Sequence, residues 1–205
     1  MSESSWLSDA AESWPVAASE ELATGIVVRI RRDKVRMPDG KVAGREIVEH
    51  PGAVAVVALD DAGQVLLIRQ YRHPVGQQLW ELPAGLRDLP GEPALATAQR
   101  ELLEEAGYRA AEWHALADYF TSPGISTEHL SIFLAQSPEP VPESERDYIP
   151  DHEEAHLVVG WAPLDDVVSA FLAGRLHNGV LAVGVLAAYA ARADGFAGLR
   201  AAEAR

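Results

Sequence analysis

Three glutamates, Glu101, Glu104 and Glu105, follow one another at helical spacing within residues 81–108. Because the residues of an α-helix advance by about 100 degrees each, these side chains fall in one narrow sector of the surface. Two carboxylates about 4 Å apart repel by roughly 4 kcal/mol at an effective dielectric constant near 20. A solvated acidic face or a salt bridge to Arg100 would relieve this repulsion, and so would bound divalent cations.

The residue types in the chain narrow the choice of cation. The chain has no cysteine, and its seven histidines show no paired metal-binding spacing. Oxygen ligands alone favour a hard cation, Mg²⁺ or Mn²⁺, over zinc. Magnesium commonly takes one or two protein carboxylates and completes its coordination with water and substrate phosphate oxygens. The acidic sector therefore indicates a site for a pyrophosphate substrate.

A helix from residue 93 to residue 106 is needed to position these carboxylates. Pro93 is tolerated in a first helical turn, and Gly107 supplies a C-terminal stop. A second sector of the same helix is apolar and should pack on a core; it consists of Leu95, Ala98, Leu102 and Ala106.

The rest of the chain alternates between strand and helix patterns. Residues 1 to about 21 are acidic and are expected to form a poorly ordered or late-docking arm, and a meander of exposed strands should begin at Gly25. Residues 53–60 and 64–72 should form a central hairpin. Further strands are expected at residues 113–120, 129–135 and 156–163, and helices at 164–175 and 179–193. This order predicts an α+β sandwich with helices outside a mixed sheet.

The overall charge limits the partners of the chain. A formal net charge of -14 disfavours nonspecific binding to nucleic acid and to anionic membranes. The acidic start has neither the basic nor the apolar region of a secretory signal, and the apolar segment 180–191 is too short to span a bilayer. We expect a cytoplasmic protein with no nucleic-acid or membrane partner.

The segment around the glutamates resembles the Nudix box, which has a glycine, a glutamate and an Arg-Glu-apolar-any-Glu-Glu-any-Gly-apolar run at fixed spacing. The matching positions are Gly85, Glu92, Arg100, Glu101, Leu102, Glu104, Glu105, Gly107 and Tyr108. The gap from Gly85 to Glu92 is one residue longer than usual, and Tyr108 stands where an aliphatic residue is commoner. The resemblance implies a Nudix-like α/β/α sandwich and hydrolysis of a nucleoside diphosphate linked to another group.

Residue roles follow from this resemblance. It implies that Glu101, Glu104 and Glu105 bind the divalent cations, that Glu104 also serves catalysis, and that the backbone carbonyl of Ala84 is a further ligand. Glu92 and Arg100 would be structural partners that orient the carboxylates.

Outside the box, the chain resembles the ADP-ribose pyrophosphatase subgroup in the stretch "RQYRHPVGQQLWELPAG" and in Pro123, fifteen positions beyond Tyr108. That subgroup carries a catalytic glutamate on a late loop, so the resemblance implies Glu153 as general base, with Glu154 as the second candidate. His152 is a third group near that place. Substrate contacts are expected from Arg45, Arg72, Glu81 and Pro123. For the two arginines, ordinary pairing on the strand surface with Glu46 or Asp60 remains the alternative.

The expected activity is divalent-metal-dependent hydrolysis of ADP-ribose to AMP and ribose 5-phosphate. Hydrolysis of another nucleotide sugar or dinucleotide, and a non-catalytic ADP-ribose-binding regulator, are the alternatives. Residues 1–51 should form an acidic arm and β-extension that serves dimerisation, before a catalytic domain at residues 52–205. In the resembling family such an extension exchanges between subunits, so we expect a homodimer.

Overall fold

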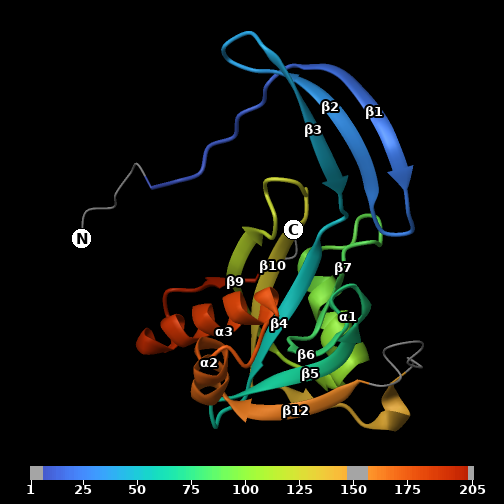
Figure 1. Cartoon of the computed structure of the whole chain (residues 1–205). Helices are drawn as coiled ribbons and strands as arrows, with labels where there is room; N and C mark the ends of the chain where they lie inside the picture. Colours follow the sequence, from blue (N-terminus) through green and yellow to red (C-terminus); the bar gives the residue numbers. More distant parts are fainter. Residues whose placement is uncertain (1–6, 147–156, 203–205) are drawn as a thin grey trace. The chain divides into compact units, whose positions relative to one another are not determined.

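The computed structural model describes residues 7–146 and 157–202, which fall into two compact units. The N-terminal unit comprises the chain up to His50 together with Ser122–Thr127, and the main unit comprises Pro51–Thr121 and the chain from Glu128 onward. Figure 1 traces both along the chain. Among the described helices, none is long and apolar enough to cross a membrane.

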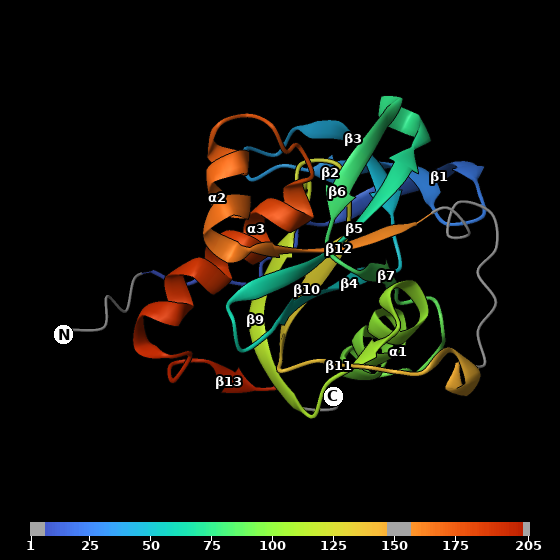
Figure 2. The ribbon, with the colours of Figure 1, turned by 90° about the horizontal axis from the view of Figure 1, so that it is seen from below.

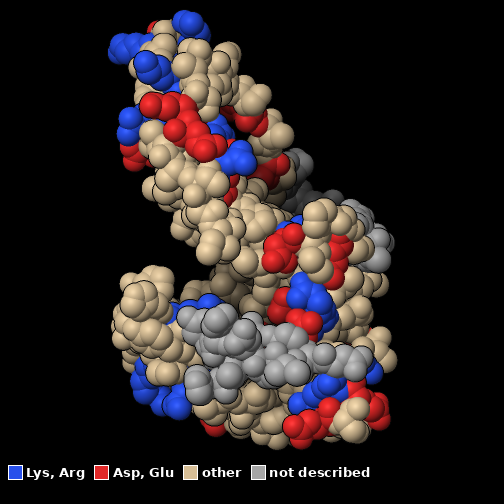
Figure 3. Space-filling view, turned by 90° about the vertical axis from the view of Figure 1, so that its right-hand side faces the viewer, with Lys and Arg blue, Asp and Glu red and all other residues tan. Residues whose placement is uncertain are grey.

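The N-terminal unit is built on an antiparallel sheet in the order β1–β2–β3. Its strands are β1 (Val16–Thr24), β2 (Arg29–Arg36) and β3 (Val42–Glu49). Cross-strand ion pairs such as Arg32 with Glu46 and Arg29 with Glu21 stabilise the sheet modestly, because they are exposed. Acidic and basic side chains are accordingly intermixed over this unit (Figure 3).

The prediction of a poorly ordered arm is wrong for residues 16–21, which belong to strand β1. The local sequence "VAASEELAT" lacks an alternating pattern, so it gave no strand signal. The strand forms through pairing with β2 instead, where Ser19 donates a hydrogen bond of 2.7 Å to the buried carboxylate of Asp33. A turn follows β2, where Gly40 adopts a φ of 83° and its backbone N–H donates to the carbonyl of Met37.

The main unit has a mixed sheet in the order β12–β5–β4–β10–β9–β13, with β6 paired to β5 and β7 paired to β4. The strands of this sheet are β4 (Ala53–Leu59), β5 (Gln64–Arg72), β6 (Gln77–Glu81), β7 (Ala84–Leu86), β9 (Glu112–Phe120), β10 (His129–Gln136), β12 (Val158–Pro163) and β13 (Arg200–Ala201). The helices are α1 (Ala94–Ala106), α2 (Leu164–Leu172) and α3 (Gly179–Ala191). A short pair, β8 (Tyr108–Arg109) and β11 (Glu139–Pro140), lies apart from this sheet.

Helices cover both faces of the main sheet (Figure 2). On one face, Leu164, Val167 and Leu181 of α2 and α3 pack against alternate residues of β4, β5 and β10. On the other face, Ala98 and Leu102 of α1 pack against the intervening residues of the same strands. The α+β class and the α/β/α sandwich predicted from the sequence are confirmed.

The predicted central hairpin forms only at its turn. The backbone N–H of Gly63 donates to the carbonyl of Asp60 and closes the turn. The pairing of β4 with β5 is limited to Leu59 and Val65, next to this turn. Along its other edge β4 pairs in parallel with β10, which is distant in sequence, and β5 pairs with β6 and β12. The divergence makes room at the sheet for β7 and hence for the turn that precedes α1.

Candidate active site

Helix α1 has the two faces expected from its sequence. Ala98 and Leu102 are fully buried, and Glu101 on the neighbouring sector is only 8% exposed. Gly107 ends the helix with a φ of 74°, in the left-handed region that favours glycine. Because Glu101 is buried, a solvated acidic face does not account for the carboxylates.

Arg100 joins the glutamates into one network. Its Nη1 donates to Oε1 of Glu101 at 2.7 Å and to Oε2 of Glu104 at 3.1 Å, and its Nη2 donates to Oε2 of Glu92 at 3.2 Å. Burial opposes the charge of Arg100, but the hydrogen bond to Glu92 and its other carboxylate partners raise its pKa above the ordinary value. The salt bridge to Arg100, one of the alternatives left open by the sequence, is therefore present.

Glu92 should make the stability of the protein depend on pH. Its hydrogen bonds from Arg100 and from the Thr97 hydroxyl, the latter 2.8 Å long, lower the pKa of the Glu92 carboxyl below its ordinary 4.5. A group whose pKa is lower in the folded state stabilises the fold above its unfolded pKa and loses that contribution as pH falls through the folded value. We expect Glu92→Gln to reduce the free energy of unfolding by roughly 1 kcal/mol at pH 7.

Urea unfolding between pH 7 and pH 3 measures this effect. The difference between wild type and Glu92→Gln should shrink as the pH falls below about 4.5, the ordinary pKa of glutamate. Glu139→Gln, which changes an exposed carboxyl, should have the same free energy of unfolding as the wild type at each pH. A wild-type stability advantage over Glu92→Gln that persists undiminished at pH 3 contradicts the assigned role of the charge.

The carboxylates of Glu101 and Glu105 converge on strand β7. Oε2 of Glu105 accepts a hydrogen bond of 2.8 Å from the backbone N–H of Ala84. The Glu101 carboxylate lies so close to Gly85 that a Cβ at this position would overlap it. Glycine is therefore needed here for close approach of a side chain to the backbone.

The residues at this turn fit a hard divalent cation by the chemistry of their donors. Two carboxylates, those of Glu101 and Glu105, meet the backbone of β7, and the space that a Cβ would fill at Gly85 is taken by carboxylate oxygens. As the described side chains stand, no three or more acidic or histidine groups are arranged as a metal site. Glu101 and Glu104 would have to exchange contacts with Arg100 for contacts with an ion.

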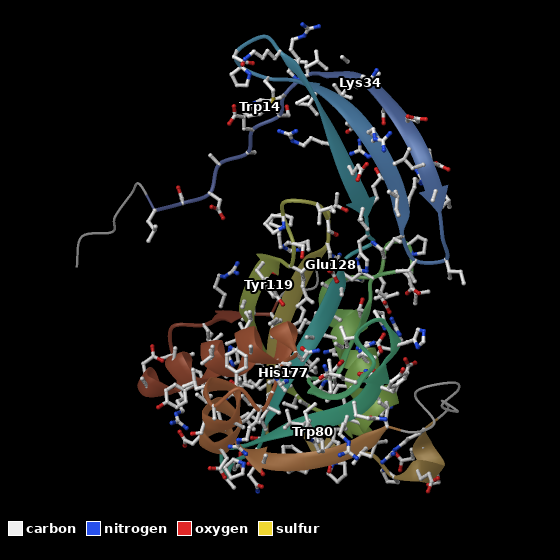
Figure 4. All side chains as sticks on the ribbon, viewed as in Figure 1. Trp14, Lys34, Trp80, Tyr119, Glu128 and His177 are labelled. Atoms are coloured by element: carbon white, nitrogen blue, oxygen red, sulfur yellow. The ribbon has the colours of Figure 1, made fainter. Side chains whose placement is uncertain are left out.

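Arg72 and Glu81 form a second cluster on the main sheet. Nε and Nη2 of Arg72 donate to the two carboxylate oxygens of Glu81 at 2.9 and 2.6 Å, and Gln70 donates to Glu81 at 3.3 Å. Arg72 and Gln70 alternate along β5 with the same parity as Leu66, which packs on α1, so the pair faces the α1 side of the sheet. Trp80, labelled in Figure 4, adjoins Glu81 and lies beneath the guanidinium of Arg69, 5.3 Å from the ring centroid.

The remaining predicted residues lie in the N-terminal unit or outside the described residues. Arg45 is exposed on β3, where its Nη1 donates to the carbonyl of Gly44 at 2.8 Å. Pro123 is exposed in the segment Ser122–Thr127, so both residues belong to the N-terminal unit. Glu153, Glu154 and His152 lie outside the described residues.

Three supporting residues were not anticipated from the sequence. Gln70 donates a hydrogen bond to Glu81, and the fully buried Thr97 donates one to Glu92. The guanidinium of Arg146 lies next to Gly107, and its Nε donates to the carbonyl of Val141 at 2.8 Å. The alternation along β5 could have identified Gln70, because it places a polar side chain on the face occupied by Leu66. No local pattern marks Thr97 or Arg146.

Comparison with known proteins gives a consistent picture. The family model described as NUDIX domain matches residues 49–182. An ADP-ribose pyrophosphatase of Mycobacterium tuberculosis is 46% identical over 173 residues, covering 84% of this chain and 82% of that protein. An ADP-ribose pyrophosphatase of Bacillus subtilis is 41% identical over 119 residues, covering 58% of this chain and 64% of that protein. A solved structure described as an ADP compounds hydrolase shares the fold, with a TM-score of 0.74, 21% identity, and coverage of 92% of this chain and 99% of that one.

Proposed function

The chain belongs to the Nudix family, and on that premise we propose that it hydrolyses the pyrophosphate bond of ADP-ribose to AMP and ribose 5-phosphate. The observation that carries the proposal is the convergence of Glu101 and Glu105 of α1 on strand β7 at Ala84 and Gly85. Two relatives named ADP-ribose pyrophosphatase support the choice of substrate.

Members of this family depend on divalent metal ions, and we propose Mg²⁺ or Mn²⁺ here because the donors are all oxygen atoms. When bound, such ions neutralise phosphate charge and lower the pKa of a bound water. Glu101, Glu104, Glu105 and the carbonyl of Ala84 would hold them. Arg100 and Glu92 would keep the carboxylates in position, since both already contact this network.

The reaction adds water across the P–O–P bridge. The oxygen of the attacking water bonds to one phosphorus, the bond from that phosphorus to the bridging oxygen breaks, and the second phosphate leaves with the bridging oxygen. A carboxylate base must accept a proton from the water, and we propose Glu153 for this role, with Glu154 as the alternative. Arg72 would stabilise phosphate charge from the end of β5, with Glu81 holding its guanidinium in position. Arg45 and Pro123 are further proposed substrate contacts.

The substrate assignment is tested with purified protein, Mg²⁺ or Mn²⁺, and a panel of ADP-ribose, GDP-mannose and a diadenosine polyphosphate. The proposal expects the highest kcat/KM for ADP-ribose, with AMP and ribose 5-phosphate as products. Fast turnover of another compound alongside none of ADP-ribose rejects the substrate but leaves the reaction class. Calorimetric binding of ADP-ribose without any turnover favours the non-catalytic regulator.

The identity of the base is tested by Glu153→Gln and Glu154→Gln. We expect Glu153→Gln to lose most of its kcat with little change in KM, because the amide cannot accept the proton. Glu154→Gln should retain turnover within a few-fold of wild type. The opposite result assigns the base to Glu154, and full activity in both variants contradicts a base in this pair.

We also propose that the protein is a homodimer joined through its N-terminal unit. Every residue of β1 is exposed, and apolar side chains along the segment are open to solvent, with Trp14 at 43%, Val16 at 52% and Leu22 at 40%. Exposed apolar strands of this kind mark interaction surfaces. Size-exclusion chromatography with light scattering should give about twice the 22.1 kDa chain mass. A single-chain mass at all micromolar concentrations would contradict the dimer.

The cytoplasmic location expected from the sequence stays a prediction, which fractionation of cells that express the protein would test.

A further inference from the structure

A cavity of about 340 Å³ lies in the main unit, on the face of the sheet that carries α1. The lining residues that matter are Arg87, Ala94, Asp118, Ser131, Phe133 and Arg200. Ser131 faces Asp118 across the β9–β10 pair, and Phe133 packs with the α1 side of the core. None of the residues assigned above to metal or substrate lines this cavity.

Arg87 is the residue that points to a ligand. It follows β7, and its backbone N–H donates to the carbonyl of Gly52 at 3.1 Å. Its Nε atom is inaccessible to solvent and has no hydrogen-bond acceptor among residues 7–146 and 157–202. The Arg87 side chain is only partly buried and lines the cavity, and its Nη groups make no ion pair within the described part of the chain. These Nη groups, rather than the enclosed Nε, are the donors that an anion in the cavity could reach.

Arg200 and the start of α1 add positive potential at the cavity, whereas Asp118 adds a negative charge. Arg200 lies 3.8 Å from Asp118, and its side chain is 75% exposed, so this pairing leaves the guanidinium able to bind an anion. Ala94 is the first residue of α1, whose first turn has no acidic residue and no side-chain cap. The positive end of the helix dipole therefore lies near this wall, with the Glu92 carboxylate bonded to Thr97 a few residues away.

The donors suit a phosphate group better than a carboxylate. Arg87 and Arg200 can each present two or more N–H groups, and the hydroxyl of Ser131, which is 8% exposed, adds another donor. A phosphate monoester has three terminal oxygens to accept from donors that approach from different walls, whereas a carboxylate has two. The cavity also offers apolar surface to a small organic group, at Ala94, Ala115 and Phe133.

We propose that this cavity binds the phosphate group of a small phosphate ester, with Arg87 as its principal donor. The site goes beyond the proposed hydrolysis, because it uses no residue of the carboxylate network. Binding of a phosphate ester at this site can be measured directly, so the test does not depend on whether the protein hydrolyses ADP-ribose.

Titration of ¹⁵N-labelled full-length protein with inorganic phosphate, without divalent ions, tests the proposal. We expect saturable shifts of the amide signals of Ala94, Ser131 and their neighbours, and tighter binding of glycerol 3-phosphate than of inorganic phosphate. No saturable change at these amides would overturn the site. So would shifts confined to residues 101–105. Acetate that binds as tightly as phosphate would overturn the assignment to a phosphate ester.

Variants separate a built site from general electrostatic attraction. Arg87→Gln should weaken phosphate binding at least about ten-fold. Arg109→Gln changes the charge equally at an exposed position outside the cavity and should bind like the wild type. Ser131→Ala, a smaller change, should weaken binding a few-fold and keeps the test valid if Arg87→Gln does not fold. Unchanged affinity in Arg87→Gln, or in Ser131→Ala if it alone folds, would overturn the proposal.

Discussion

Glu105→Gln is expected to lower kcat for ADP-ribose by about 10²–10³-fold while the protein keeps its fold. The Glu105 carboxylate accepts a hydrogen bond from the backbone N–H of Ala84, and the amide oxygen of glutamine can accept the same bond. The local structure should therefore survive. The negative charge that would hold a divalent cation is lost, and a neutral amide is a much weaker ligand for Mg²⁺ or Mn²⁺.

The measurement combines steady-state kinetics with a metal titration by calorimetry. Glu139→Gln is the matched control, because it makes the same chemical change at an exposed site on β11. The variant at Glu105 should melt within a few degrees of the wild type and bind the cation more weakly. Wild-type turnover in Glu105→Gln, or a cation affinity equal to that of the control, would remove Glu105 from the metal site.

Helix α1 could be predicted because its signals are local. Its apolar stripe, its proline start and its glycine end all lie within 15 residues of one another. The spacing of the three glutamates also sets which side of the helix they occupy, whatever the rest of the chain does. What the carboxylates contact is not local: Ala84 is 21 positions before Glu105.

The missed elements depend on partners that are distant in sequence. Strand β1 is a strand because β2 pairs with it, and its own residues have no strand pattern. The parallel partner of β4 is β10, more than 70 residues later, so no turn signal joins them. Strand β7 has three residues, too few for periodicity to show, yet it supplies the backbone N–H that fixes Glu105. The sequence motifs therefore identified the cluster of carboxylates on α1, but they did not predict the strand pairing that supports it.

Gly85→Ala is expected to lower kcat by on the order of 10²-fold through displacement of Glu101. The added Cβ would occupy the position of the Glu101 carboxylate, and Gly85 is paired in β7 with Val54, so the backbone cannot easily move away. Glu101 must then swing out, which moves a proposed metal ligand by about the width of a methyl group. It also breaks the 2.7 Å hydrogen bond from Arg100 to Glu101.

A double-mutant cycle distinguishes this displacement from a general weakening of the turn. Gly179→Ala, at a glycine with open space around its Cβ position, should leave activity and stability unchanged. In the wild-type background Gly85→Ala should reduce the free energy of unfolding by about 1–3 kcal/mol, the usual cost of overpacking. In a Glu101→Ala background the same change meets no carboxylate, so most of that cost should vanish. If Gly85→Ala lowers the free energy of unfolding equally in the two backgrounds, the glycine is required only by the backbone conformation, and Glu101 is not held next to Gly85.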